Sequence, residues 1–434
     1  MKYFSTKNKT VPFSFEDAVL KGLPQDNGLF VPEYLPQLDA DFLSQLSRYS
    51  FQEIGTEIGK HFVGNEIETS VLNKIINEVL SFPAPLVTVE DNIHSLELYH
   101  GPTLAFKDFG ARFMARIMHH FNKNKNKKLR ILVATSGDTG GAVASGFFGL
   151  SGIEVVILYP KGRVSHYQKK QLTTFGNNIQ AIEVDGSFDD CQRLVKLAFL
   201  DSDINKVCSL SSANSINISR LIPQSFYYFE AVKQLNLDKN TSLYFSVPSG
   251  NLGNLTAGLY AKKMGLKIDK FISANNANDF FSNYLISENE TFKESVITLS
   301  NAMDVGAPSN FYRILGLYGS TWNNIVKEIN PYVLSDAQTI SAITKCYKDN
   351  NYILDPHGAI GYSSLKSYIK FNKNIVGVFL ETAHPAKFYE ELERKVPFKI
   401  PIPTELQKLN ELKEVYIELS ADFESFKEYL INTQ

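Results

Sequence analysis

The stretch His100-Gly101-Pro102-Thr103-Leu104-Ala105-Phe106-Lys107-Asp108-Phe109-Gly110 sets the organisation that the sequence predicts. Its Gly-Pro pair breaks any regular element, and apolar residues recur at helical spacing from Phe109 onward. Lys107 is therefore expected in the first turn of a helix, where unpaired N–H groups and the positive dipole end disfavour an ammonium. This bias favours the neutral amine, the form that bonds to a carbonyl carbon in a Schiff base. A solvated lysine beside Asp108 is the alternative, and for a lysine considered alone it is the commoner case.

The rest of the chain alternates between strand-like and helix-like segments. Apolar runs predict strands at 129–134, 153–159, 179–184, 207–210, 243–247, 271–274, 353–354 and 375–380. Helices are expected at about 142–150, 188–200, 218–235 and 254–264. This alternation predicts an α/β fold with mainly parallel sheets and with sites at the carboxyl ends of the strands.

The chain before about residue 90 has a different character. Its pattern of apolar residues predicts helices, and the stripe at 71–80 is the clearest helical pattern. No residue of this segment stands out as catalytic. We therefore expect three parts: a helical N-terminal extension at 1–90, a smaller α/β domain at 91–215 and a larger one at 216–434.

Two loops between a predicted strand and a predicted helix could hold an anion. The first, Gly250-Asn251-Leu252-Gly253-Asn254, is a turn whose backbone N–H groups could face phosphate oxygens. It has neither the dinucleotide fingerprint nor a P-loop lysine, and simple turn geometry would explain its glycines equally well. The second, Ser136 to Gly141, offers hydroxyls, glycines and Asp138, which suits a carboxylate or a phosphate together with a ring substituent. A Schiff-base lysine and a phosphate cradle on an α/β scaffold together suggest pyridoxal phosphate.

Composition excludes several other classes of function. The chain has 434 residues, a net charge of −2 and three widely spaced cysteines. The charge does not favour a nucleic-acid partner, and the basic run 123–128 reads as a solvated loop. The cysteines do not suit a disulfide framework or a zinc site. No apolar run is long enough for a signal core or a membrane span, so we expect a cytoplasmic protein with neither a metal nor a membrane partner.

Four motifs, in order, resemble those of the threonine synthase family, which has the type II fold of pyridoxal-phosphate enzymes. His100 to Asp108 resembles its cofactor-lysine motif, and Ala134 to Gly140 resembles its loop along the substrate and the cofactor ring. Gly250 to Asn254 is similar to its phosphate cradle, and Glu381 to Lys387 to its C-terminal signature. Related dehydratases and cysteine synthases usually carry Asn at the position of Asp138, and they lack the N-terminal extension. The resemblance covers nearly the whole chain and implies two open, mainly parallel α/β domains.

The resemblance also implies a reaction and a set of residue roles. The reaction is conversion of O-phospho-L-homoserine and water to L-threonine and phosphate, the last step of threonine synthesis. Lys107 would hold the cofactor and move protons, Asp138 would lie near the ring 3-hydroxyl, and Thr382 would face the pyridine nitrogen. The cofactor phosphate would be bound by Gly250, Asn251, Leu252, Gly253 and Asn254.

The substrate would be held by other side chains. Ser136 and Thr139 would lie near its carboxylate. For its phosphate we predict a clamp of Asn214, Arg220 and Lys161, while Arg112 remains an open alternative and the histidines at 357 and 384 receive no role.

Two other functions remain open at this point, because related folds carry them. One is a serine or threonine dehydratase-like lyase, and the other is a catalytically silent ligand-binding relative. The sequence does not distinguish a monomer from a homodimer.

Overall fold

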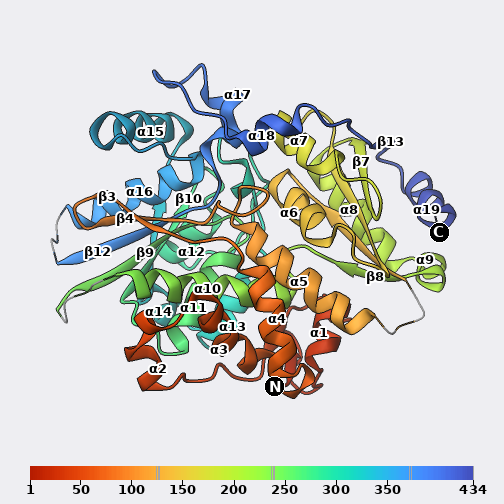
Figure 1. Ribbon diagram of the computed structural model, residues 1–434, viewed down its shortest axis with the longest axis horizontal. Helices are drawn as coiled ribbons and strands as arrows, with labels where there is room; N and C mark the ends of the chain where they lie inside the picture. The colour runs from red at the N-terminus through yellow and green to blue at the C-terminus, as the bar shows by residue number, and fades with distance from the viewer. Residues whose placement is uncertain are drawn as a thin grey trace.

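The chain folds around two sheets of mainly parallel strands, one in each half of the molecule (Figure 1). The computed structural model describes all residues of 1–434 except 124, 126, 127, 236, 238, 239, 371, 373 and 434. Among the described residues the larger sheet has the order β11-β10-β9-β12-β4-β3 and the smaller one β13-β7-β6-β5-β8. All pairs within these two sheets are parallel except the antiparallel β3–β4 hairpin. The α/β class predicted from the alternation is therefore confirmed.

The strands have the following bounds: β1 Tyr3–Ser5, β2 Phe30–Pro32, β3 Leu86–Glu90, β4 Ile93–Glu97, β5 Leu129–Ala134, β6 Ile153–Pro160, β7 Ile179–Asp185, β8 Ser209–Ser212, β9 Ser242–Pro248, β10 Lys270–Asn275, β11 Ile329–Val333, β12 Ile375–Glu381 and β13 Ile417–Ser420. Every residue of β5 and β6 is buried, as is typical of parallel strands covered by helices on both faces.

The helices of the first half are α1 Phe15–Lys21, α2 Ala40–Ser44, η1 Leu46–Arg48, α3 Phe51–Val63, η2 Gly64–Glu66, α4 Thr69–Val79, α5 Lys107–Asn122, α6 Asp138–Phe147, α7 His166–Thr173, α8 Phe188–Leu200 and α9 Ser202–Val207. Those of the second half are α10 Ile218–Gln234, α11 Gly253–Lys263, α12 Phe280–Ser287, η3 Asn301–Met303, α13 Phe311–Leu317, α14 Trp322–Val326, α15 Asp336–Asn350, α16 Pro356–Ile369, η4 Pro385–Phe388, α17 Tyr389–Leu392, α18 Thr404–Leu409 and α19 Phe423–Asn432.

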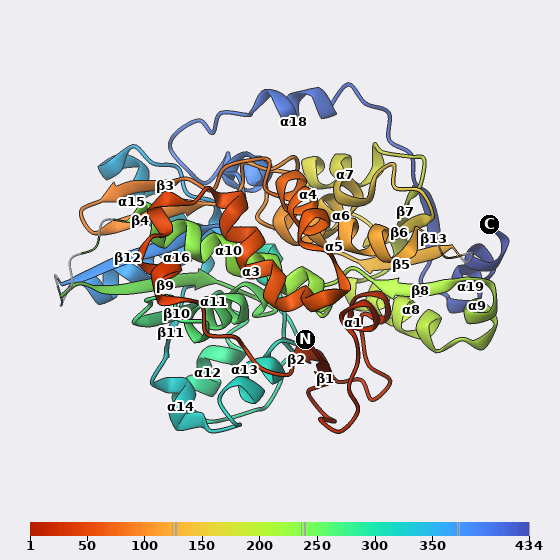
Figure 2. The same cartoon turned by 60° about the horizontal axis from the view of Figure 1, so that its bottom comes forward.

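The N-terminal segment forms helices, as predicted, together with the small β1–β2 sheet (Figure 2). The predicted stripe of α4 is buried through Leu72, Ile75, Ile76 and Val79. Helix α3 begins at a capping box in which Ser50 and Glu53 satisfy each other's backbone N–H groups. Helix α3 packs on both α4 and α10, so this segment is joined to the rest of the protein.

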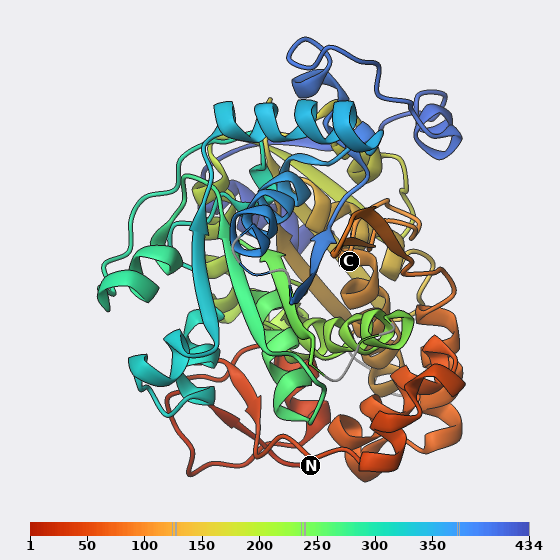
Figure 3. The same ribbon diagram turned by 90° about the vertical axis from the view of Figure 1, so that its left-hand side faces the viewer.

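Helices α5 and α10 pack against each other near the middle of the molecule (Figure 1). Every residue of α10 from Ile218 to Ala231 is buried, which is characteristic of a helix enclosed on all sides. On the outside, α16 packs against β9, β10 and β12 of the larger sheet (Figure 3). This arrangement brings the start of α5 to the carboxyl ends of strands from both sheets.

The predicted domain boundaries do not coincide with the two sheets. Strands β3 and β4 belong to the larger sheet, because β4 pairs with β12 from the other end of the chain. Conversely, β13 pairs with β7 and completes the smaller sheet. The segment that carries α18 runs from one half of the molecule to the other before β13 (Figure 2). Sequence order alone cannot reveal such long-range pairing.

Some individual elements also differ from their predictions. The apolar pair at 353–354 forms no strand, and the larger sheet instead has β11 at 329–333 as one of its two edge strands. The helix expected at 142–150 begins four residues earlier, at Asp138. The basic run 123–128 lies partly outside the described residues; of the rest, Lys125 pairs with Glu16 at 2.6 Å.

Candidate active site

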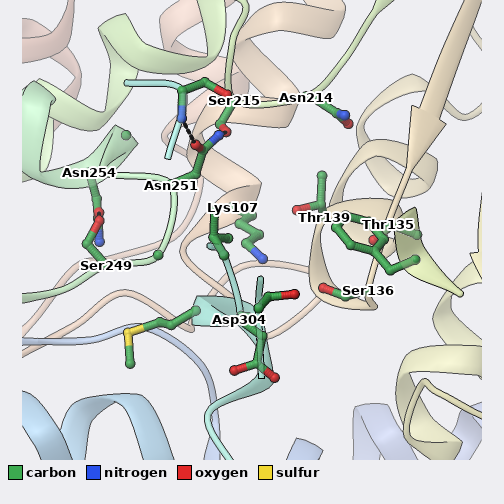
Figure 4. A pocket seen from close by; sticks show the side chains of 18 of the residues that line it. Lys107, Thr135, Ser136, Thr139, Asn214, Ser215, Ser249, Asn251, Asn254 and Asp304 are labelled. Carbon is green, nitrogen blue, oxygen red and sulfur yellow. Dashed lines mark hydrogen bonds between the residues drawn. The ribbon is translucent and has the colours of Figure 1, made fainter. Parts of the chain in front are cut away.

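A cavity of about 380 Å³ lies where strands of both sheets end (Figure 4). Its wall includes Ala134 at the end of β5, Pro248 at the end of β9 and Thr382 directly after β12. Lys107 lies in the cavity, between Ser249, Asn251 and Asn254 on one side and Ser136 and Thr139 on the other (Figure 4). A cavity of this size at strand ends is a typical site for a small ligand.

Lys107 is the first residue of α5, as the sequence predicts. The loop before it is fastened to the segment after β12, because Phe106 N donates to Thr382 O at 2.8 Å and His384 N donates to Leu104 O at 3.0 Å. Burial lowers the pKa of Lys107 to about 8, with Arg220 acting in the same direction and the Asp138 carboxylate opposing it. The predicted bias toward the neutral amine is therefore found, but its main cause is burial of the amine rather than its place on the helix.

The loop after β9 forms the predicted turn. Leu252 has a φ of 59°, and α11 begins at Gly253 without a side-chain cap among the described residues. Side chains of the loop are engaged within the protein: Asn251 Nδ2 donates to Ser215 Oγ at 2.6 Å, and Asn254 Nδ2 donates to Pro248 O at 2.9 Å. The first N–H groups of α11 have no intrahelical acceptor, so the turn can receive an anion through its main chain.

The loop after β5 places two of its three predicted side chains in the cavity. Thr135 Oγ1 accepts hydrogen bonds from Gly137 N at 3.0 Å and Gly140 N at 2.9 Å, which fixes the turn. Ser136 and Thr139 line the cavity as expected. Asp138 does not line it: its carboxylate forms an ion pair with Lys387 at 2.7 Å and accepts from Gln168 Nε2 at 3.1 Å. Asp138 is therefore behind the wall rather than in it.

Two of the three residues predicted to clamp the substrate phosphate reach the cavity. Arg220 is 3% exposed and lines the cavity, and its Nη1 donates to Ala213 O. Its Nε and the Oδ1 atom of Asn214 are buried without a hydrogen-bond partner among the described residues. Burial lowers the pKa of Arg220 to about 10, with the Asp108 carboxylate opposing the shift, so the guanidinium keeps its positive charge at neutral pH.

Lys161 is the exception, and its predicted place in the clamp is wrong. Its side chain is half exposed, outside the cavity, and its Nζ pairs with Glu418 of β13 at 2.8 Å. The strand that supplies this partner was not predicted. Arg112, the open alternative, also points elsewhere, because its Nη2 donates to Glu78 O at 2.6 Å.

Sequence reasoning missed a histidine in the wall. His357 is 2% exposed and lines the cavity in the first turn of α16. Its Nδ1 pairs with Asp355 Oδ1 at 2.5 Å, while its Nε2 accepts from Ala302 N at 3.3 Å. The Asp355-Pro356 pair ahead of it is a recognisable helix start, but that signal places the histidine on a helix and not in a cavity.

A second residue had no assigned role, although it lies in a motif that the sequence singled out. Lys387 is 1% exposed, and its Nζ contacts Asp138 and donates to Thr103 O at 2.8 Å.

Comparisons with known proteins identify the family. A model described as "Threonine synthase N terminus" matches residues 2–80, "Pyridoxal-phosphate dependent enzyme" matches 84–381 and "Threonine synthase, C-terminal" matches 358–430. The chain is 44% identical to a threonine synthase of Haemophilus influenzae over 434 residues, with all of both chains covered. The chain belongs to the threonine synthase family. It is therefore a pyridoxal-phosphate-dependent lyase of threonine biosynthesis, and the matches at both ends favour this function over a dehydratase.

Solved structures of threonine synthases agree with this membership. The crystal structure of threonine synthase from Escherichia coli has a TM-score of 0.93 and 42% identity, with all of both chains covered. A structure of pyridoxal-phosphate-bound threonine synthase from Brucella melitensis has a TM-score of 0.93 and 34% identity, with 99% of each chain covered. The type II fold is thus confirmed, and pyridoxal phosphate is the family's cofactor.

The residues of this threonine synthase family member fit that cofactor. A lysine whose pKa burial has lowered stands at the start of α5, and an uncapped helix start faces the same cavity. A Cβ on Gly250 would lie 2.6 Å from Met303 Cα, so glycine is what this closely packed turn requires.

Within the described part of the chain, no helix has the length and apolar character needed to cross a bilayer.

Proposed function

We propose that the substrate is O-phospho-L-homoserine, which the enzyme converts with water to L-threonine and phosphate. The observation that carries this proposal is that Arg220 lines the same cavity as Lys107 and that its buried Nε has no hydrogen-bond partner among the described residues. A buried guanidinium N–H without a hydrogen-bond partner is expensive, whereas the oxygens of a phosphate monoester are acceptors that a guanidinium binds strongly. A dehydratase acting on serine or threonine has no phosphate to place there.

The cofactor would be held by residues of four segments. Lys107 would bond to its aldehyde carbon through Nζ, and the main-chain N–H groups of Gly250, Asn251, Leu252, Gly253 and Asn254 would bind its phosphate. Thr382 would face the pyridine nitrogen, because it lines the cavity directly after β12. Asp138 would act on the ring region from behind the wall, within electrostatic reach of Lys107. Bound in this way, the cofactor supplies an electron sink for the carbons of the amino acid.

The side chains of the cavity then have separate tasks. Ser136 and Thr139 would hold the substrate carboxylate next to the helix start of α6. Arg220 and Asn214 would hold the substrate phosphate and stabilise the charge that grows as the bond between Cγ and oxygen breaks. Lys107 Nζ, once free and neutral, can accept a proton from carbon and return one later. In the net reaction, phosphate leaves Cγ, Cβ loses a proton and Cγ gains one, the hydroxyl of water bonds to Cβ, and the remaining proton of water goes to the released phosphate.

Product analysis tests this proposal directly. Purified enzyme given O-phospho-L-homoserine should release phosphate and L-threonine in equal amounts, and should release little ammonia from L-serine. Lys107→Ala should lose at least about a thousandfold in kcat, because it lacks both the covalent anchor and the proton carrier. Rapid ammonia release from serine with no threonine from the phosphate ester would instead establish the dehydratase alternative.

We further propose that the enzyme acts in the cytoplasm as a monomer or a homodimer. Cys191, Cys208 and Cys346 are all buried thiols, which supports a reducing compartment. One chain supplies every residue of the proposed site, so the site does not require a second copy.

A further inference from the structure

Lys387 forms a buried ion pair behind the cavity wall. Its side chain is 0% exposed and that of Asp138 is 3% exposed, with Nζ and Oδ1 2.7 Å apart. The same Nζ donates to Thr103 O at 2.8 Å, and Gln168 Nε2 donates to Asp138 Oδ1 at 3.1 Å. Because both charges are fully removed from water, each depends on the other for compensation.

The pair joins three segments that meet at Lys107. Lys387 belongs to η4, which follows the central strand β12 of the larger sheet. Asp138 opens α6 beside the smaller sheet, and Thr103 lies in the loop that leads to Lys107. Ser165 Oγ also donates to Lys387 O at 3.1 Å, so the lysine is held through its main chain as well.

Asp138 is close enough to act on Lys107 electrostatically. The charged groups that act on the Lys107 amine are Asp138, Arg220 and Lys387. Of these, Asp138 favours a proton on the amine, whereas Arg220 and Lys387 disfavour one. Asp138 itself is acted on by Lys387, Lys107 and His357, which together bring the pKa of its carboxyl below the usual value despite its burial. An ionised Asp138 without Lys387 would therefore favour a proton on the Lys107 amine more strongly.

We propose that Lys387 is a positioning residue that, by pairing with Asp138, prevents this carboxylate from holding a proton on the Lys107 amine that bonds to the cofactor. This inference rests on the proposed role of Lys107 as the cofactor lysine. Lys387 itself lies behind the cavity wall, so it acts on the chemistry through Asp138 and by its own charge. If the pair served packing alone, a change of its charges would leave the proton affinity of Lys107 unaltered.

The test measures the proton affinity of Lys107 rather than catalysis. The full-length protein, freed of cofactor, is labelled with acetic anhydride from pH 6 to pH 11, and the extent of labelling at Lys107 is read by mass spectrometry. Lys387→Met should raise the pH midpoint of this labelling by about one unit or more, because one uncompensated carboxylate remains. At pH 7 the same variant should bind pyridoxal phosphate about tenfold more weakly, because less neutral amine is present.

Three matched variants separate charge from packing. Lys387→Arg keeps the positive charge and should keep the midpoint near that of the wild type. Asp138→Asn alone should lower the midpoint, because the attracting carboxylate is gone while Lys387 remains. The double variant Asp138→Asn, Lys387→Met should bring the midpoint back below that of Lys387→Met.

Either of two results would overturn the proposal. One is an unchanged midpoint in a Lys387→Met protein that circular dichroism shows to be folded. If that variant does not fold, an unchanged midpoint in Asp138→Asn is equally decisive. Failure of the proposed function is distinguishable, since an enzyme that makes no threonine would still give these labelling curves.

Discussion

Gly250 lies against Met303 so closely that a methyl group on its Cα would come within 2.6 Å of Met303 Cα. The neighbour is backbone and cannot turn aside, so a side chain here would displace the turn that faces the cavity. Gly253 of the same turn is different, because a methyl group there would meet nothing closer than Asn310 Nδ2 at 3.6 Å. The two glycines are therefore a matched pair for testing the cofactor cradle.

We expect Gly250→Ala to weaken pyridoxal phosphate binding by about tenfold or more, since overpacking of this kind costs about 1–3 kcal/mol. Gly253→Ala should bind the cofactor within about threefold of the wild type, since its contact is an ordinary one. Absorbance titration of cofactor-free protein measures both. Equal losses in the two variants would show that the close approach to Met303 is not what shapes the cradle.

Arg220→Lys should raise KM for O-phospho-L-homoserine by about 10- to 100-fold, because a charge-assisted hydrogen bond contributes about 1.5–3 kcal/mol. It should also weaken inhibition by inorganic phosphate to a similar extent. Lys161→Ala is the control, since Lys161 pairs with Glu418 outside the cavity, and its KM should not change. Unchanged phosphate inhibition in Arg220→Lys would remove this residue from the proposed clamp.

His357 links α16 to the wall behind the phosphate turn. Ala302 N donates to its Nε2, so the proton lies on Nδ1 and is donated to Asp355. Ala302 belongs to η3, and the next residue, Met303, is the one that backs Gly250. The histidine therefore supports the turn from a distance.

Two replacements of His357 separate its two hydrogen bonds. Gln can keep an acceptor near the position of Nε2, whereas Asn keeps only a donor near that of Nδ1. We expect His357→Asn to weaken cofactor binding by about fivefold relative to His357→Gln, since one hydrogen bond contributes about 1 kcal/mol. Cofactor titration decides the matter, and the reverse order of affinities would be incompatible with this role.

Lys107 should also make stability depend on pH. Burial lowers its pKa to about 8 in the folded protein, against about 10.4 in an unfolded chain. Between these values the unfolded state binds a proton that the native state does not, so this contribution to stability rises with pH. The destabilisation is complete below about pH 8 and is relieved above about pH 10.

Lys107→Met should therefore be more stable than the wild type at pH 7, by on the order of 1–3 kcal/mol after screening by solvent. Urea unfolding of the cofactor-free proteins at several pH values measures the difference. We expect it to shrink toward pH 10. A constant difference across that range would mean that the methionine acts through packing alone.

The sequence predicts well those helices and strands whose bounds depend on residues close together in the chain. Helix α8 was expected at about 188–200 and spans Phe188–Leu200, where the Ser187 capping box marks its start. Strand β5 spans the predicted residues 129–134. Strand β11 escaped prediction because Pro331 interrupts it, which an edge strand tolerates.

The site was predictable only where one segment carries the information. The turn at 250–254 and the position of Lys107 follow from neighbouring residues, and both are found as expected. The partners of Asp138 and Lys161 are not predictable in this way, because Lys387 and Glu418 lie far along the chain. Carboxyl ends of strands indicate where a site lies, but pairing between distant segments decides which side chains turn toward it.

Strand β12 lies between β4 and β9, and β13 forms the edge beside β7. During synthesis, the hairpin at 86–97 thus has no neighbour in its sheet until residues 375–381 leave the ribosome, and β7 stays uncovered until 417–420 emerge. Neither sheet has all its strands until the last part of the chain has been made. We therefore expect each lobe, expressed from a continuous piece of the chain, to lack a strand that the other end of the chain supplies.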